Sequence, residues 1–149
     1  MSTSRLASTT LAILALLPFG SSAAPADATL RVEITNLRST QGEVGCLIFN
    51  SPDGYPETRT KAYKTLRATI EGGHALCEFK NVAPGTYAAI IGHDENRNGK
   101  VDKNFIGAPR EGYAASNNVR HKMSAPGFQE ASFAVPAGAV TSINVQVGY

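Results

Sequence analysis

Short segments of alternating apolar and polar residues recur along this chain, and almost no segment shows the 3.6-residue period of a helix. Turns rich in Gly and Pro separate these segments at intervals of about 8–12 residues, a pattern typical of antiparallel sandwiches. We therefore predict an all-β fold, a seven-stranded antiparallel β-sandwich with one long functional loop. The first two strands are expected to pair as a hairpin, and the fourth and fifth as another. The predicted strands are residues 30–34, 44–49, 66–70, 75–82, 86–93, 131–135 and 140–147.

The first 23 residues have the features of a signal peptide. Arg5 precedes an apolar run over residues 11–19, and small residues at 21–23 offer a cleavage site. The apolar run is too short for a membrane-spanning helix, which needs about 20 residues. We therefore expect residues 1–23 to be a signal peptide, residues 24–149 to form a single β-sandwich domain, and the mature protein to be periplasmic or secreted.

The two cysteines fit an oxidising compartment. Cys46 and Cys77 each lie in phase with apolar neighbours two residues away, so both side chains are expected to face the core. A disulfide between them would close a loop of about 30 residues and stabilise the fold by roughly 3–4 kcal/mol. Two buried, unpaired cysteines are the alternative, and metal ligation by so isolated a pair is disfavoured.

Charge and composition exclude some classes of function. The 149 residues include 14 Lys and Arg against 12 Asp and Glu, a formal charge of +2, and the basic residues are scattered along the sequence. This distribution lacks the basic cluster typical of nucleic-acid-binding proteins and of proteins that bind anionic membranes. The chain also has no second long apolar segment, so we expect no membrane span after signal cleavage.

A long irregular stretch, residues 94–127, interrupts the strand pattern and begins with the segment Asp94-Glu-Asn-Arg-Asn-Gly-Lys-Val-Asp102. Loops of this length in a compact domain are commonly functional. Counted from Asp94, oxygen-bearing side chains stand at positions 1, 3, 5 and 9 and a glycine stands at position 6, which is the spacing of an EF-hand-type calcium loop. The expected Ca²⁺ ligands are Asp94, Asn96, Asn98, the backbone carbonyl of Lys100, and Asp102.

The rest of this loop limits the calcium prediction. Position 12 is Phe105 where the regular loop has a bidentate Glu, so we expect modest affinity. His93 and Glu111 are further candidates for ligation or for contacts with the loop. Because Asp, Asn and Gly are also the preferred residues of Asx-turns, a metal-free loop held by such turns is the alternative.

Four segments taken together resemble a bacterial family. They are residues 42–56, 84–88, 93–102 and 107–118. As a set, their motifs HDxNxNGxxD, EGY and SNN look like those of the exported bacterial domain-of-unknown-function family 2141, over nearly the whole mature chain. The resemblance implies an envelope or secreted protein with a transthyretin-like or immunoglobulin-like sandwich, and no established reaction. Arg97 departs from the pattern, because such loops often carry Gly there. A larger side chain places a greater demand on the local backbone, but position 4 of such a loop points outward, so we expect no loss of the site.

The leading functional prediction is an exported, non-catalytic binding or structural module that carries this loop and binds a carbohydrate, a peptide or an envelope protein. Tyr55, Tyr113 and Phe128 would form an aromatic face on which the ligand stacks, and Asn117 and Asn118 would hydrogen-bond to it. The other interpretation of the aromatic residues Tyr55, Tyr113 and Phe128 is that they cover the core.

Two other functions remain open at this point. A small metal-dependent enzyme would use His93 and Asp94, since His is a common metal ligand and the natural general base near neutral pH. No nucleophile elbow accompanies them, and the sequence assigns no catalytic residue. A purely structural envelope protein is the second alternative.

Overall fold

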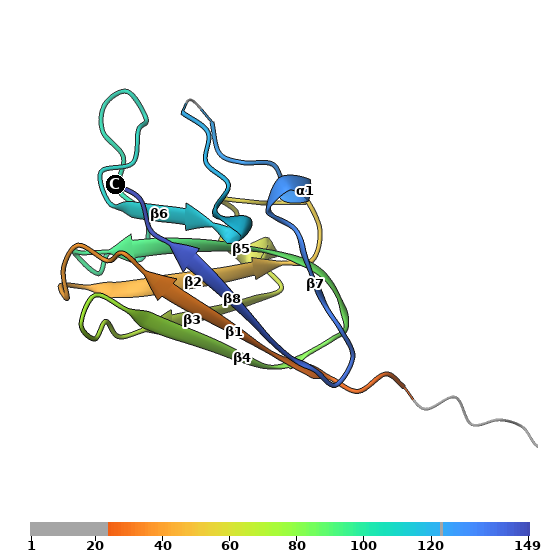
Figure 1. The fold of residues 1–149 in the computed structure, drawn as a ribbon. Helices are drawn as coiled ribbons and strands as arrows, with labels where there is room; N and C mark the ends of the chain where they lie inside the picture. The colour runs from red at the N-terminus through yellow and green to blue at the C-terminus, as the bar shows by residue number, and fades with distance from the viewer. Residues whose placement is uncertain (1–23, 123) are drawn as a thin grey trace, which may run out of the picture.

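The computed structural model describes residues 24–122 and 124–149, and in these residues it contains eight strands and three single-turn helices (Figure 1). The strands are β1 (Ala28–Thr35), β2 (Glu43–Phe49), β3 (Lys64–Ala68), β4 (Ala75–Val82), β5 (Gly85–Asp94), β6 (Gly112–Ala115), β7 (Phe133–Val135) and β8 (Val140–Gln146). The helices are η1 (Arg59–Lys61), η2 (Ser116–Asn118) and α1 (Phe128–Ala131). Residues 1–23, on which the signal-peptide prediction falls, lie outside the described residues.

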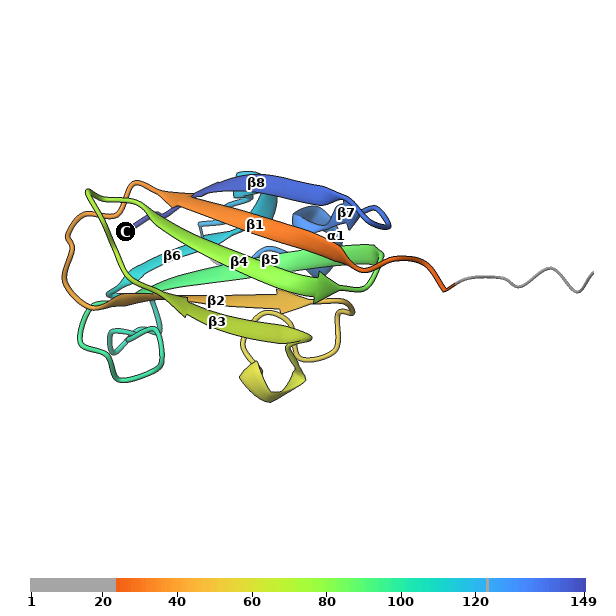
Figure 2. The same cartoon turned by 90° about the horizontal axis from the view of Figure 1, so that it is seen from below.

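The strands form two sheets that stack on one another (Figures 1 and 2). The smaller sheet has the order β4-β1-β8, and the larger has the order β3-β2-β5-β6, with β7 also paired to β5. The prediction of an all-β chain is confirmed. Two details differ from the prediction. β8 runs parallel to β1, and β6 forms inside the stretch that was expected to be irregular. The sequence of β6, Gly-Tyr-Ala-Ala, is too short and too rich in small residues to show alternation.

Both predicted hairpins are wrong. β1 pairs with β4 and β8, whereas β2 pairs with β3 and β5, so the chain crosses from one sheet to the other between its first two strands. β4 and β5 likewise belong to different sheets. Alternation of apolar residues identifies the buried face of a strand but says nothing of its partner.

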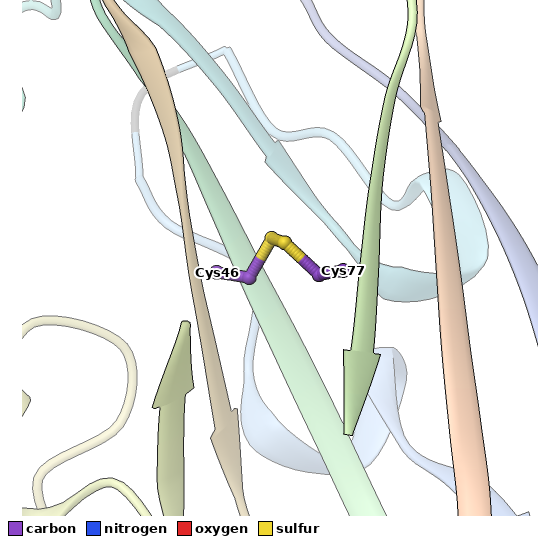
Figure 3. Close-up of a disulfide and its surroundings, with 2 residues drawn as sticks. All are labelled: Cys46 and Cys77. Atoms are coloured by element: carbon purple, nitrogen blue, oxygen red, sulfur yellow. A yellow bond between two sulfur atoms is a disulfide. The ribbon is translucent and has the colours of Figure 1, made fainter. Parts of the chain in front are cut away.

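The core between the sheets is built from the inward side of each strand. On β2 the side chains of Val44, Cys46 and Ile48 are fully buried, as is Ile91 on β5. Cys46 forms a disulfide with Cys77 of β4, with an S–S distance of 2.07 Å and a sequence separation of 31 residues. Figure 3 shows this bond crossing from the larger sheet to the smaller one.

A second apolar cluster covers part of the outer face of the larger sheet. Phe128 of α1 packs there with Ile90 of β5. Tyr55 stands between Phe49 and Phe128, at ring-centroid distances of 5.4 and 5.7 Å and nearly perpendicular to both. These aromatic rings therefore cover the sheet and do not form an open stacking platform. Among the described residues, the model contains no helix with the length and apolar character needed to cross a membrane.

Candidate functional site

Asp94 is the last residue of β5 and opens the loop predicted to bind calcium. Its Oδ1 accepts a hydrogen bond from the backbone N–H of Asn98 at 3.0 Å, and its Oδ2 accepts one from that of Gly99 at 2.7 Å. The residue is 6% exposed. One carboxylate thus turns the chain back on itself, as an Asx-turn does.

The asparagines at positions 3 and 5 of the loop continue this arrangement. Oδ1 of Asn96 accepts from the N–H of Asn98, and Oδ1 of Asn98 accepts from the N–H of Lys100, both at 3.0 Å. Their side-chain amides donate to the carboxylate of Asp102 at 2.7 and 2.8 Å. The amide of Asn98, followed by that of Asn96, holds the pKa of Asp102 below its usual value. The structure therefore gathers the predicted side-chain ligands in one loop, in the hydrogen-bonded form that the Asx-turn alternative describes.

Glu111 clasps the two ends of the loop. It is 5% exposed, and its two carboxylate oxygens accept the backbone N–H groups of Glu95 and Asp102, each at 2.9 Å. The sequence predicts Glu111 as a ligand or a loop contact, and in the structure its carboxylate contacts the backbone of the loop. A buried carboxylate that binds two backbone N–H groups fixes the distance between the segments that carry them.

The backbone of the loop explains three residue choices. Arg97 and Gly99 both have left-handed backbone, with φ of 59° and 84°. Glycine adopts this conformation freely, whereas Arg97 adopts it at a steric cost because it carries a Cβ atom. Gly42 faces the loop across the strand pair, where an added Cβ would lie 2.1 Å from the carbonyl oxygen of Asp94.

His93 lies on the opposite side of the sheet from this loop. It is fully buried, its Nε2 lies 2.8 Å from the carbonyl oxygen of Gln41, and its Nδ1 lies 2.6 Å from the hydroxyl of Tyr149. Because a carbonyl can only accept, Nε2 carries the proton and Nδ1 accepts from Tyr149. Both ring nitrogens are therefore engaged, and successive residues of a strand point to opposite faces, so His93 and Asp94 do not converge. Within the described residues, no group of three or more His, Cys, Asp or Glu side chains is placed to hold a metal ion.

Asn117 and Asn118 have internal partners instead of a free binding surface. The Asn117 amide donates to the carbonyl oxygens of Glu130 and Ser132 at 3.1 and 2.8 Å. The Asn118 side chain donates to the carbonyl of Asn144 at 3.2 Å and accepts the N–H of Gln146 at 2.7 Å, both on β8. Asn118 thus pairs with the edge of β8 as a neighbouring strand would.

Tyr113 contributes to a surface cleft of about 780 Å³ on the outer face of the larger sheet. The calcium-type loop forms one wall, and Val101 of that loop rests on the sheet, since a Cβ on Gly92 would lie 2.7 Å from its Cγ2. The other walls are provided by segments near residues 56–59 and 106–109 and by residues 121, 122, 124 and 125. In Figure 1 the loop around residues 100–110 and the segment that leads into α1 both extend beyond β6, at the same edge of the larger sheet.

Sequence reasoning missed the floor of this cleft, which includes Gly45 and Leu47 of β2 and Ile90 and Gly92 of β5. A signal for it was present in the sequence. Between Glu43 and Asp94 at one end of the strand pair and the opposite end, the middle outward positions of β2 and β5 are apolar or glycine, whereas a strand with one solvated face has polar residues there. An apolar stretch on the outward side indicates that something covers this face as well.

The charges of the cleft do not cancel. Arg67 pairs with Glu43, and Lys103 pairs with Glu57 at 2.7 Å. Three further basic residues line the cleft and have no carboxylate within 4.0 Å among residues that the structure describes: Arg59, Lys100 and Lys122.

These features define a class, a disulfide-linked all-β protein of two sheets with an Asx-rich loop beside an apolar cleft. Within that class, the chain belongs to the family described as uncharacterised proteins conserved in bacteria, domain-of-unknown-function family 2141, whose family model matches residues 32–144. The matched region contains the whole loop and all eight strands except the start of β1 and the end of β8, so the resemblance seen in the motifs is confirmed at the level of the family. Comparisons with curated proteins and with solved structures gave no match.

Proposed function

We propose that this protein is an exported, non-catalytic binding module of the bacterial envelope or of the secreted fraction, in which a Ca²⁺-type loop orders one wall of a ligand cleft. The observation that carries the proposal is the position of the cleft, which shares Asp94, Gly99, Lys100 and Val101 with the loop. A cation bound in the loop would fix the wall against which a ligand lies. The volume of about 780 Å³ falls in the range of about 300–1,000 Å³ usual for small-molecule sites.

The chemistry of the loop supports a hard cation. Asp94 and Asp102 supply carboxylates, Asn96 and Asn98 supply amide oxygens, and Lys100 would supply a backbone carbonyl, all of which are ligand types that Ca²⁺ takes. Each amide oxygen already accepts one hydrogen bond and has a second lone pair for a cation. The amide groups now bonded to Asp102 would have to release it for a cation to bind. Since only two of the four side chains are charged, we expect weak binding.

Export is supported by two features of the chain. The segment over residues 1–23 has the composition of a signal peptide. A disulfide buried between two sheets persists in an oxidising compartment and is rare in a reducing one.

The engagement of both His93 ring nitrogens favours a binding module over the enzyme alternative.

The test is the thermal unfolding of residues 24–149 in chelator and then in millimolar Ca²⁺, Mg²⁺ or Zn²⁺, together with ¹⁵N NMR spectra in the same solutions. We expect Ca²⁺ to raise the unfolding midpoint, because a ligand that binds only the folded state stabilises it. Amide signals of Gly92, Lys100 and Val101 should shift with the loop.

The matched variants are Asp94→Ala, which should abolish the Ca²⁺ response, and Asp27→Ala, an exposed acidic residue outside the loop, which should retain it. No response to Ca²⁺ would overturn the cation part of the proposal. A response selective for Zn²⁺ would overturn it in favour of the metal-dependent enzyme. Shifts that stop at residue 98 and leave the cleft signals unchanged would show that the loop does not order the cleft.

A further inference from the structure

We propose that the cleft binds a long-chain carboxylate, a single-chain amphiphile with an anionic head, with its alkyl tail along the floor and its head at the basic rim. The inference rests on the proposed function, in that it takes the cleft as the ligand site, and it names the class of ligand.

The floor of the cleft is a trough between two strands. Gly45 of β2 and Gly92 of β5 are direct cross-strand partners, and the next outward pair is Leu47 with Ile90. Above Gly45 the space is open, because an added Cβ would meet nothing nearer than a backbone oxygen at 4.0 Å. The trough is thus open over Gly45, is bounded over Gly92 by a methyl group of Val101, and has aliphatic side chains at the next pair, a shape that fits a narrow alkyl chain.

The walls extend this apolar surface to the solvent. Val101 flanks the trough over Gly92, and Ile106 lines the cleft although it is 74% exposed. Its neighbour Phe105 is 100% exposed. A bulky apolar side chain that lines an apolar cleft and remains in solvent, next in sequence to a second one, indicates a surface that is covered in use.

The rim selects the charge of the ligand. Lys100, Arg59 and Lys122 line the cleft and lack a carboxylate partner among the described residues, whereas the acidic lining residues are already engaged. Glu43 and Glu57 pair with basic residues, and the carboxylate of Asp94 accepts two backbone N–H groups. The unpaired charge at the cleft is therefore positive, and it complements an anionic head group.

The same contacts disfavour a carbohydrate. A sugar site needs an exposed aromatic face and several fixed hydrogen-bonding groups. Tyr113 is the one aromatic residue described in the cleft lining, and the amides of Asn117 and Asn118 are bonded within the chain. The lining offers aliphatic area and positive charge instead.

The experiment titrates the protein over residues 24–149 with dodecanoate and follows binding by calorimetry and ¹⁵N NMR, with dodecanol and acetate as ligands that lack the head or the tail. We expect saturable binding of dodecanoate that shifts the Gly45, Leu47 and Gly92 amides. Dodecanol should bind about tenfold more weakly, and acetate should show no saturation.

The decisive variant is Gly45→Val, which fills the trough and suits a strand, so that it should abolish binding while the protein stays folded. Its counterpart at the rim is the double variant Lys100→Gln/Lys122→Gln, which should weaken dodecanoate about tenfold and leave dodecanol unchanged. The matched controls are Leu76→Asn and Lys80→Gln on the smaller sheet, far from the cleft, and both should bind as the unaltered protein does. Leu47→Asn gives an independent loss of binding at the floor.

Three results would overturn the proposal: no saturable binding of dodecanoate, equal binding by Gly45→Val, or binding to anionic phospholipid vesicles with none to dodecanoate. If dodecanoate fails while Ca²⁺ still shifts Lys100 and Gly92, the ligand class is wrong and the proposed function stands. If the Ca²⁺ response fails and dodecanoate binds, the cleft stands and the cation part falls.

Discussion

Single carboxylates decide the shape of the loop, and Glu111 is the clearest case. Its two oxygens hold the N–H groups of Glu95 and Asp102, which enter and leave the turn of the loop. Glu111→Gln replaces one acceptor oxygen by an NH₂ group that faces a backbone donor. We expect the free energy of unfolding to fall by about 2 kcal/mol, because hydrogen bonds to buried charged groups contribute about 1.5–3 kcal/mol.

Urea unfolding at neutral pH in chelator measures this loss without any contribution from a cation. Glu71→Gln is the matched control, because Glu71 is exposed and outside the loop. An unchanged unfolding midpoint in Glu111→Gln would show that the clasp does not stabilise the fold.

Tyr87 sets a limit to stability at high pH. Its ring is 2% exposed, its hydroxyl donates to the carbonyl of Ala83 at 2.7 Å, and burial raises its pKa from 10.0 to about 12. Since the pKa is higher in the folded state, the contribution is fully present below pH 10 and is lost as the pH rises toward 12. We expect the free energy of unfolding to decline across this interval, and to decline less in Tyr87→Phe. Urea unfolding at several pH values checks this, and parallel declines in the two proteins would contradict it.

Residue spacing predicted part of the site and missed the rest for physical reasons. Alternate oxygens at positions 1, 3, 5 and 9 pointed to a curled loop, and in the structure Asp94 and Asp102 both accept hydrogen bonds from Asn98. The roles of His93 and Asn118 depend on Tyr149 and β8, which lie far away in the sequence. Whether a polar side chain binds a ligand or hydrogen-bonds within the protein cannot be decided from one sequence until its neighbours in space are known.

At the scale of elements, the disulfide is a covalent cross-link between side chains of the two sheets. It joins β2 to β4 across 31 residues. On the chain-entropy account, its reduction should lower the free energy of unfolding by about 3–4 kcal/mol. Urea unfolding of the protein with and without dithiothreitol measures this difference. Reduction leaves both cysteine side chains in place, so no cavity contributes to the result. The Cys46→Ala/Cys77→Ala variant should be insensitive to reductant, and an unaltered protein equally insensitive would mean that the bond does not form.

The contact between the loop and β5 can be tested by a compensating pair. Gly92→Ala places a Cβ only 2.7 Å from Cγ2 of Val101. We therefore expect the free energy of unfolding to fall by about 1–3 kcal/mol because of overpacking. Val101→Ala removes the clashing methyl groups, and the double variant should be more stable than Gly92→Ala alone. Thermal unfolding of the three variants gives the coupling between the two sites. If the losses simply add, the loop does not rest on Gly92.

Strand positions were largely predictable from alternation, and strand partners were not. The predicted segments 44–49, 75–82 and 86–93 overlap β2, β4 and β5 closely. The parallel pairing of β8 with β1 joins segments more than 100 residues apart, and no local turn signal encodes such a pairing. β6 is found only because β5 offers a free edge to four small residues that show no pattern of their own.

At the scale of the whole molecule, folding gathers basic residues that are scattered along the sequence around one cleft. Arg59, Lys100 and Lys122 lie far apart in the sequence, and the sequence therefore indicated no basic footprint. Folding brings all three to one cleft whose carboxylates are already engaged. Charge counted along a chain thus underestimates what a cleft lined by several segments presents to a ligand.

The loop and the cleft share a wall, so cation and ligand are expected to bind cooperatively. If Ca²⁺ orders the segment that carries Lys100 and Val101, the protein pays less to order it when dodecanoate binds. Saturating Ca²⁺ should then strengthen dodecanoate binding by about fivefold or more, within the usual range of coupling between sites.

Thermodynamic linkage makes this prediction strict, because dodecanoate must strengthen Ca²⁺ binding by the same factor. Calorimetric titrations in both orders measure the two factors. Glu111→Gln loosens the loop without removing a cleft residue, and it should reduce both factors together. Equal dodecanoate affinities in Ca²⁺ and in chelator would show that the two sites are neighbours in space but are not coupled, since a shared wall couples them only if one ligand changes how that wall is ordered.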